Sequence, residues 1–99
     1  DGPQAFAAGS VVFDVGDPGD SMYVVERGVV VVTDANDRVV ARAKDGDVVG
    51  ERSLMGSERR ALRATVDVDA NAPASLLELS AFESHWSPYD RVGVVNFIP

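Results

Sequence analysis

The stretch from residue 50 to residue 66 carries the side chains with the clearest chemistry. It begins with Gly50 and contains Arg59, Arg60 and Arg63 within five positions. A glycine that opens a short helical turn leaves backbone N–H groups available to an anion. The planar arginine side chain suits bidentate contact with a phosphate, and each charge-assisted hydrogen bond contributes roughly 1.5–3 kcal/mol. This combination predicts a phosphate-binding site.

An acidic residue, Glu51, lies next to this predicted anion site. Its carboxylate repels a phosphate, but it can accept a hydrogen bond from a sugar hydroxyl. Turn N–H groups, an arginine and a carboxylate together describe a receptor for a sugar phosphate. The same residues also suit a solvated face before a strand, so the residue types leave both interpretations open.

The surrounding chain consists of short runs of β-branched residues separated by turn formers. These runs predict strands over residues 11–13, 22–25, 29–33, 39–42, 48–49, 61–70 and 76–79. Asp34 to Asp37 can close a hairpin. Within 61–70 the alternation places Asp67 and Asp69 on one solvated strand face rather than in a catalytic carboxylate pair. Many short strands with Gly and Asp between them indicate a sandwich or barrel.

Two segments break the β pattern. Residues 51–55 are too few for a stable free helix but suit a single helical turn held by tertiary contacts. Ser80 can cap a short helix that runs to Trp86, with Glu83 at the capping-box position. The tail after Ser87 contains an apolar run at 94–98 that suits a strand or a linker.

Composition excludes several classes of function. Ninety-nine residues suit one domain, residues 1–99, and a start without methionine suggests a piece of, or an insertion in, a larger protein. The net charge of −7, with eight arginines and one lysine, argues against nucleic-acid binding by this fragment. No apolar run approaches the roughly 20 residues of a membrane span. The absence of cysteine favours a cytoplasmic location.

Two motifs resemble those of one known family. The segment from Gly16 through Tyr23 to Gly28 is similar to the opening hairpin of cyclic nucleotide-binding domains. Gly50-Glu51, a downstream arginine and Ala64-Thr65-Val66 resemble that family's phosphate-binding cassette. The resemblance covers about residues 8 to 83. It implies an all-β double-stranded β-helix, or jelly roll, with a helical turn in the cassette and a short C-terminal helix.

The resemblance also implies roles for individual residues. The family's glutamate, here Glu51, binds the ribose 2′-hydroxyl, and an arginine pairs with the cyclic phosphate. Counting forward from Glu51 places Arg60 at the arginine position, whereas the Ala64-Thr65 register favours Arg63; Leu62 occupies the position that the family pattern gives to arginine. Both assignments stay open. The implied ligand-binding residues are Gly50, Glu51, Arg60, Ala61, Arg63 and Thr65.

The expected function is a ligand-sensing regulatory module for cAMP, cGMP or a related sugar phosphate, without enzymatic activity or a cofactor. The nucleotide and the rest of a parent protein are its expected partners, with homo-oligomerisation left open. A degenerate domain that serves assembly or protein interaction is the alternative, because the arginine is displaced and little helix follows the strands. A metal-dependent cupin-type enzyme shares the architecture but normally needs several histidines, and His85 is alone.

Overall fold

The computed structural model describes residues 2–19, 21–50, 59–70, 72–80 and 96–98. Every element formed by these residues is a strand, as the all-β prediction requires. The strands are β1 (Gln4–Phe6), β2 (Val11–Phe13), β3 (Ser21–Arg27), β4 (Val30–Thr33), β5 (Val39–Ala43), β6 (Asp47–Val49), β7 (Arg63–Val66), β8 (Ala74–Ser80) and β9 (Asn96–Ile98). The expected helical turn at 51–55 and the body of the expected helix, 81–86, lie outside the described residues. Across the described residues, no helix has the length and apolar character needed to cross a membrane.

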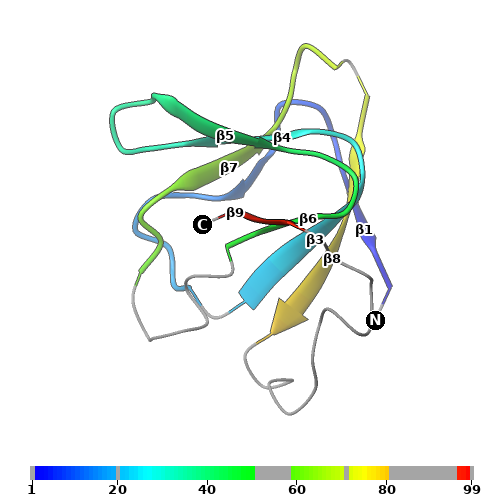
Figure 1. Ribbon diagram of the computed structural model, residues 1–99, viewed down its shortest axis with the longest axis horizontal. Helices are drawn as coiled ribbons and strands as arrows, with labels where there is room; N and C mark the ends of the chain where they lie inside the picture. The colour runs from blue at the N-terminus through cyan, green and yellow to red at the C-terminus, as the bar shows by residue number, and fades with distance from the viewer. Residues whose placement is uncertain (1, 20, 51–58, 71, 81–95, 99) are drawn as a thin grey trace.

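The strands form two sheets. The five-stranded sheet has the order β1-β8-β3-β6-β9, and the four-stranded sheet has the order β2-β7-β4-β5. Figure 1 shows β4, β5 and β7 together in the upper part of the molecule, with β3 and β8 running below them. Neighbouring strands are antiparallel except β6 and β9, which pair in parallel. Strands distant in sequence therefore lie side by side, as they do in a jelly roll.

The main core joins residues from both sheets. Its buried members are Phe13, Val25, Val30, Val32, Ala43, Val49, Ala64 and Leu76. A second buried cluster, formed by Met22, Val24, Val48, Leu77 and Leu79, uses the other face of β3, β6 and β8. Up to Val25, β3 is buried on both faces, and Met22 to Val25 accordingly form a continuous apolar run rather than an alternating one, whereas Glu26 and Arg27 at its end are exposed. This strand is a rigid support for polar groups at its beginning.

Two predictions about strands need correction. The strand expected over 61–70 is only four residues long, β7, and the sheet pairing ends at Val66. The Asp67 N–H donates to the carbonyl of Val29, and the Asp69 N–H donates to the Asp67 carboxylate, so the chain turns there. Asp67 and Asp69 therefore do not share a strand face. The predictions also omitted β1, whose three residues are held by pairing with β8.

The predicted hairpin between β4 and β5 is confirmed. One carboxylate oxygen of Asp34 accepts hydrogen bonds from the N–H groups of Asn36 and Arg38, at 2.8 and 3.0 Å. Asp37 takes a left-handed conformation with a φ of 62°, which aspartate tolerates better than most residues. The local turn chemistry of the aspartates thus closes this hairpin.

Candidate ligand-binding site

Arg60 is a buried cation, with only 4% of its surface exposed. Its guanidinium carbon lies 4.1 Å from the centroid of the Phe13 ring. Nη1 donates to the Gly50 carbonyl at 3.2 Å, and Nη2 donates to the Ser21 carbonyl. A buried charge is stable only with such compensation, and the carbonyl dipoles and aromatic face provide part of it. The guanidinium is therefore held in a defined place and orientation.

The backbone of Arg60 is fastened to the turn that follows β2. Its N–H donates to the Asp17 carbonyl, and its own carbonyl accepts from the Gly16 N–H, both at 2.8 Å. The adjacent Arg59 forms an isolated bridge with Pro18 and donates a side-chain hydrogen bond to the Gly16 carbonyl at 2.9 Å. The glycine-rich turn recognised in the sequence thus fixes the segment that carries Arg60.

Gly50 follows β6 and lies against the Arg60 guanidinium. Its φ is +81°, a conformation that L-residues with a side chain rarely adopt. A Cβ atom there would collide with the Arg60 guanidinium and would lie 3.3 Å from the Phe13 ring. Glycine is therefore required at this position both for backbone conformation and for space. The structure thus brings together Gly50 and Arg60, two of the residues proposed from the sequence.

Three polar side chains border this site on β3 and β8. Glu78 accepts hydrogen bonds from the Ser21 hydroxyl at 2.8 Å and the Tyr23 hydroxyl at 3.2 Å, both through Oε2. The Tyr23 ring stacks on Phe13, with centroids 6.0 Å apart. Burial raises the pKa of Tyr23, and the nearby Glu78 charge adds to that effect while Arg60 opposes it. Sequence reasoning did not select Glu78, although a single glutamate within the apolar run Leu76–Leu79 is an available signal.

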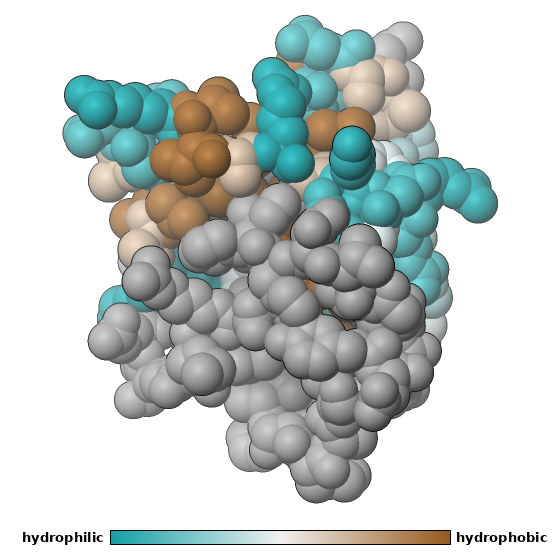
Figure 2. Space-filling model, viewed as in Figure 1, coloured by the Kyte–Doolittle hydropathy of each residue, from teal (hydrophilic) through white to brown (hydrophobic). Residues whose placement is uncertain are grey.

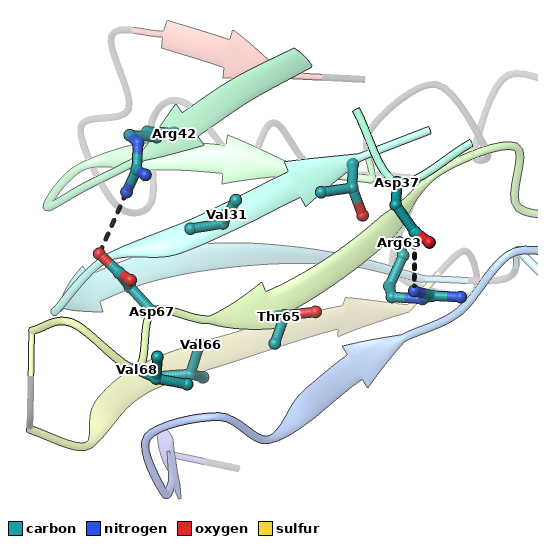
Figure 3. Close-up of a pocket in the computed structure, with 9 residues that line it drawn as sticks. Val31, Asp37, Arg42, Arg63, Thr65, Val66, Asp67 and Val68 are labelled. Carbon is teal, nitrogen blue, oxygen red and sulfur yellow. Dashed lines mark hydrogen bonds and ion pairs between the residues drawn. The ribbon is translucent and has the colours of Figure 1, made fainter. Parts of the chain in front are cut away.

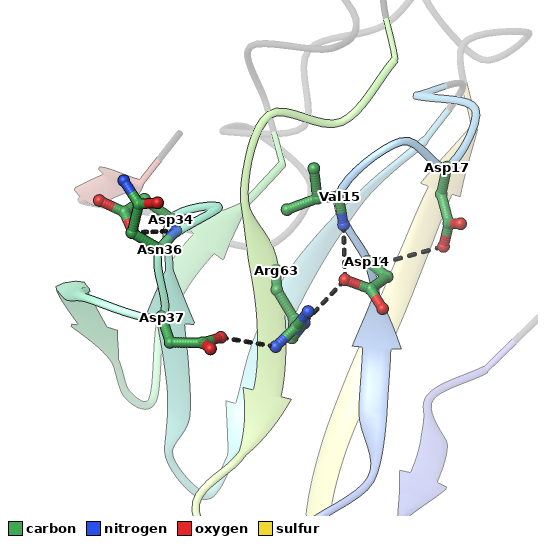
Figure 4. Close-up of polar contacts among 7 residues, drawn as sticks. All are labelled: Asp14, Val15, Asp17, Asp34, Asn36, Asp37 and Arg63. Atoms are coloured by element: carbon green, nitrogen blue, oxygen red, sulfur yellow. Dashed lines mark hydrogen bonds and ion pairs between the residues drawn. The ribbon is translucent and has the colours of Figure 1, made fainter.

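Arg63 and Thr65 lie elsewhere, on the outer face of the four-stranded sheet. Ala64 and Val66 of the same strand enter the core, so the alternation of β7 points Arg63 and Thr65 the other way. Arg63 forms ion pairs with Asp14 at 2.7 Å and with Asp37 at 2.9 Å (Figure 4). These pairs raise the pKa of Arg63, and the hydrogen bond from Arg63 lowers the pKa of Asp14. Arg63 therefore links β7 to two loops.

The remaining expected ligand-binding residues are Ala61 and Glu51. Ala61 is exposed and immediately follows Arg60, so it shares that anchored segment. Glu51 lies outside the described residues. Of the six residues proposed from the sequence, the structure thus unites Gly50, Arg60 and Ala61 in one region, and it separates Arg63 and Thr65 from them.

Comparison with known proteins gives the family. The family model described as "Cyclic nucleotide-binding domain" matches residues 3–83. The chain therefore belongs to the cyclic nucleotide-binding domain family.

Individual relatives agree with this assignment. The chain is 32% identical, over 87 residues, to a cAMP-dependent protein kinase regulatory subunit of Hypocrea atroviridis; the match covers 88% of this chain and 18% of the relative. The solved structure of cAMP-bound PfPKA-R has a TM-score of 0.72 at 19% identity, covering 91% of this chain and 28% of that one. The N-terminal domain of a transcriptional regulator from Streptomyces coelicolor A3(2) has a TM-score of 0.69 at 29% identity, covering 84% and 58% respectively. These likenesses confirm the predicted jelly roll, and the chain spans about a fifth of its curated relative.

Proposed function

We propose that this domain is a regulatory, non-catalytic module that binds the cyclic nucleotide cAMP or cGMP, with Arg60 as the cation that receives the cyclic phosphate. The observation that carries the proposal is the buried guanidinium of Arg60, held by Phe13, Gly50 and Ser21. Membership of the family supports the class of ligand. Ala61 belongs to the same anchored segment, and Glu51 is assigned to the sugar hydroxyl on the resemblance alone.

The physical advantage of this arrangement is preorganisation. A surface arginine loses rotamer freedom when it binds an anion, at a cost of about 0.5–1.5 kcal/mol for such a side chain. Arg60 is ordered before any ligand arrives. Electrostatic attraction is also stronger where water is excluded. Arg63 is also held by ion pairs, but its side chain is 35% exposed and lies on the outer face of the sheet. The exclusion of water around Arg60 therefore favours Arg60 in the phosphate role.

The relatives support the finer parts of the proposal. One is named as the regulatory subunit of a cAMP-dependent kinase and another was solved with cAMP bound, so cAMP is the first ligand to test. A regulatory role within a longer protein agrees with the small share of the relative that this chain covers. The expectations of a cofactor-free domain and of a cytoplasmic location stay predictions.

Isothermal titration with cAMP and with cGMP tests the proposal. The wild-type domain is expected to bind at least one of them. Arg60→Lys keeps the charge but loses the planar fork, and it should weaken binding roughly 10- to 100-fold, equivalent to losing one or two charge-assisted hydrogen bonds. The matched control Arg63→Lys should bind within about twofold of wild type. An absence of heat at millimolar ligand would contradict the function, and a loss confined to Arg63→Lys would contradict the assignment of Arg60.

A second candidate function, in assembly or partner contact, is favoured by exposed apolar side chains of β5 and of the turn after β7. Val39, Val40 and Val68 are between 50% and 61% exposed. Figure 2 shows apolar surface gathered over this part of the molecule. Beside it lies a hollow of about 310 Å³ (Figure 3). Two ion pairs bound this hollow, one between Arg42 and Asp67 and one between Arg63 and Asp37. Concentration-dependent sedimentation that disappears in Val40→Asp, in a domain that binds no cyclic nucleotide, would favour this function.

A further inference from the structure

We propose that Glu78 is a positioning residue that fixes the orientation of the Arg60 guanidinium through Ser21 and Tyr23. Its consequence for ligand affinity rests on the proposed function. The orientation itself is a property of the ligand-free domain and can be tested separately.

The first step is the contact between Glu78 and the two hydroxyl groups. In the β3–β8 register, Tyr23 lies directly opposite Glu78, and Ser21 is two residues away on the same face of β3. Both hydroxyls donate to one carboxylate oxygen, at 2.8 Å from Ser21 and 3.2 Å from Tyr23. An ionised carboxylate accepts hydrogen bonds and donates none, so it sets the direction of both hydroxyl hydrogens. Glu78 thus fixes two side chains of β3.

The second step runs from Ser21 to Arg60. Ser21 is 4% exposed, and its carbonyl accepts a hydrogen bond from Nη2 of Arg60. Its side chain is tied to Glu78 while its main chain holds the guanidinium. Rotation of the Ser21 peptide would therefore break its alignment with Arg60, and the Glu78 hydrogen bond resists that rotation. Ser21 is the direct link between the carboxylate and the cation.

A second route passes through the two aromatic rings. The Tyr23 hydroxyl is held by Glu78, and its ring stacks on Phe13 with an interplanar angle of 28°. The Arg60 guanidinium lies over the other partner of this stack, Phe13. Five residues thus form a closed circuit of contacts that includes the cation, in the order Arg60, Ser21, Glu78, Tyr23 and Phe13; Ser21 contacts Arg60 through its main-chain carbonyl and Glu78 through its hydroxyl. Glu78 occupies the point where the two routes meet.

A second glutamate provides a contrast on the same sheet. Glu26 of β3 is exposed and makes no hydrogen bond or ion pair among the described residues. It resembles Glu78 in charge and in strand location but lacks the link to Arg60. Glu26→Ala is therefore the matched control for Glu78→Ala.

The first experiment measures the order of the Arg60 guanidinium N–H groups by ¹⁵N relaxation in the ligand-free domain. Glu78→Ala and Ser21→Ala are expected to increase the motion of these groups, whereas Glu26→Ala leaves it unchanged. Glu78→Gln should restore most of the order, because the amide oxygen can accept the same hydroxyl hydrogens. Unchanged Arg60 order in both Ser21→Ala and Glu78→Ala overturns the proposal.

The second experiment compares cAMP with adenosine, which lacks the phosphate. Glu78→Ala is expected to weaken cAMP binding about fivefold, the equivalent of one hydrogen bond, and to leave adenosine affinity unchanged. In an Arg60→Lys background the same change should cause no further loss. Equal losses of affinity for cAMP and adenosine, or additive losses of cAMP affinity in the double variant, would show that Glu78 has only a general structural role. Either result would overturn the positioning claim. If wild type binds neither ligand, the proposed function fails, and the relaxation experiment alone decides the role of Glu78.

Discussion

The guanidinium of Arg60 lies over the ring of Phe13, 4.1 Å from its centroid, with both residues at most 5% exposed. This contact joins β2 to the segment before β7 and places a permanent positive charge against the main apolar core. A cation–π interaction is worth about 0.5 kcal/mol at exposed sites and about 2 kcal/mol or more when desolvated. The pair therefore links the stability of the core to the chemistry of the site.

Replacement of Phe13 should affect the site as well as the core. Phe13→Leu keeps an apolar side chain but removes the aromatic face, and it should weaken cAMP binding roughly 2- to 30-fold. Titration calorimetry measures this change. Phe6→Leu is the control, because Phe6 packs against the same core, whereas the guanidinium of Arg60 lies over the ring of Phe13. Equal losses of affinity in the two variants would contradict a specific role for the Phe13 ring.

Gly50→Ala should lower both stability and ligand affinity. The positive φ costs about 1–2 kcal/mol for a residue with a Cβ, and the new methyl group would displace Arg60. Gly46→Ala shares the backbone cost at a φ of +92°, but its Cβ would meet nothing within 4 Å. Chemical denaturation and cAMP titration of both variants separate the two effects. We expect similar backbone penalties but a loss of affinity only in Gly50→Ala; unchanged affinity there would contradict the close approach.

Gly28→Ala should destabilise the fold more than Gly46→Ala. Gly28 has a φ of +108°, and a Cβ there would lie 2.8 Å from the Cβ of Ala74 at the beginning of β8. The neighbouring atoms include backbone, so they cannot move aside cheaply. The free energy of unfolding should fall by more than the roughly 1–2 kcal/mol of the backbone conformation alone. Equal losses in the two variants would show that β8 accommodates the methyl group.

The ion pair of Arg63 with Asp14 should make stability sensitive to acid. The folded-state pKa of Asp14 lies below its ordinary value of 3.8, chiefly because of the hydrogen bond from Arg63. The stabilising contribution is therefore complete above the unfolded-state pKa and is lost as the pH falls through the lower folded-state pKa. In Asp14→Asn, the dependence of the melting temperature on pH below about 4 should become shallower. An unchanged slope in that range would contradict the linkage.

Much of the fold followed from local sequence. The β4 and β5 strands and the Asp34–Asp37 turn were predictable because β-branched residues and aspartates favour those conformations locally. The extent of β7 was not, because the alternation of Thr65 to Asp69 continues beyond the point where hydrogen bonding to β4 stops. The three residues of β1 are too few to show a strand pattern in the sequence, and pairing with β8 holds them in place. Hydrogen bonding to a neighbouring strand therefore decided both the extent of β7 and the presence of β1.

For the site, the residue types followed from the sequence: a glycine after β6, and arginines just before β7 and at its first position, which suit phosphate binding. It left Arg60 and Arg63 as equal candidates. Only the tertiary structure separated them, because the pleat of β7 turns Arg63 outward while Arg60 meets Phe13, Gly50 and Ser21. Ser21 is 39 positions away from Arg60 in the chain. Contacts over such separations depend on how the two sheets pack, and local residue patterns do not predict that packing.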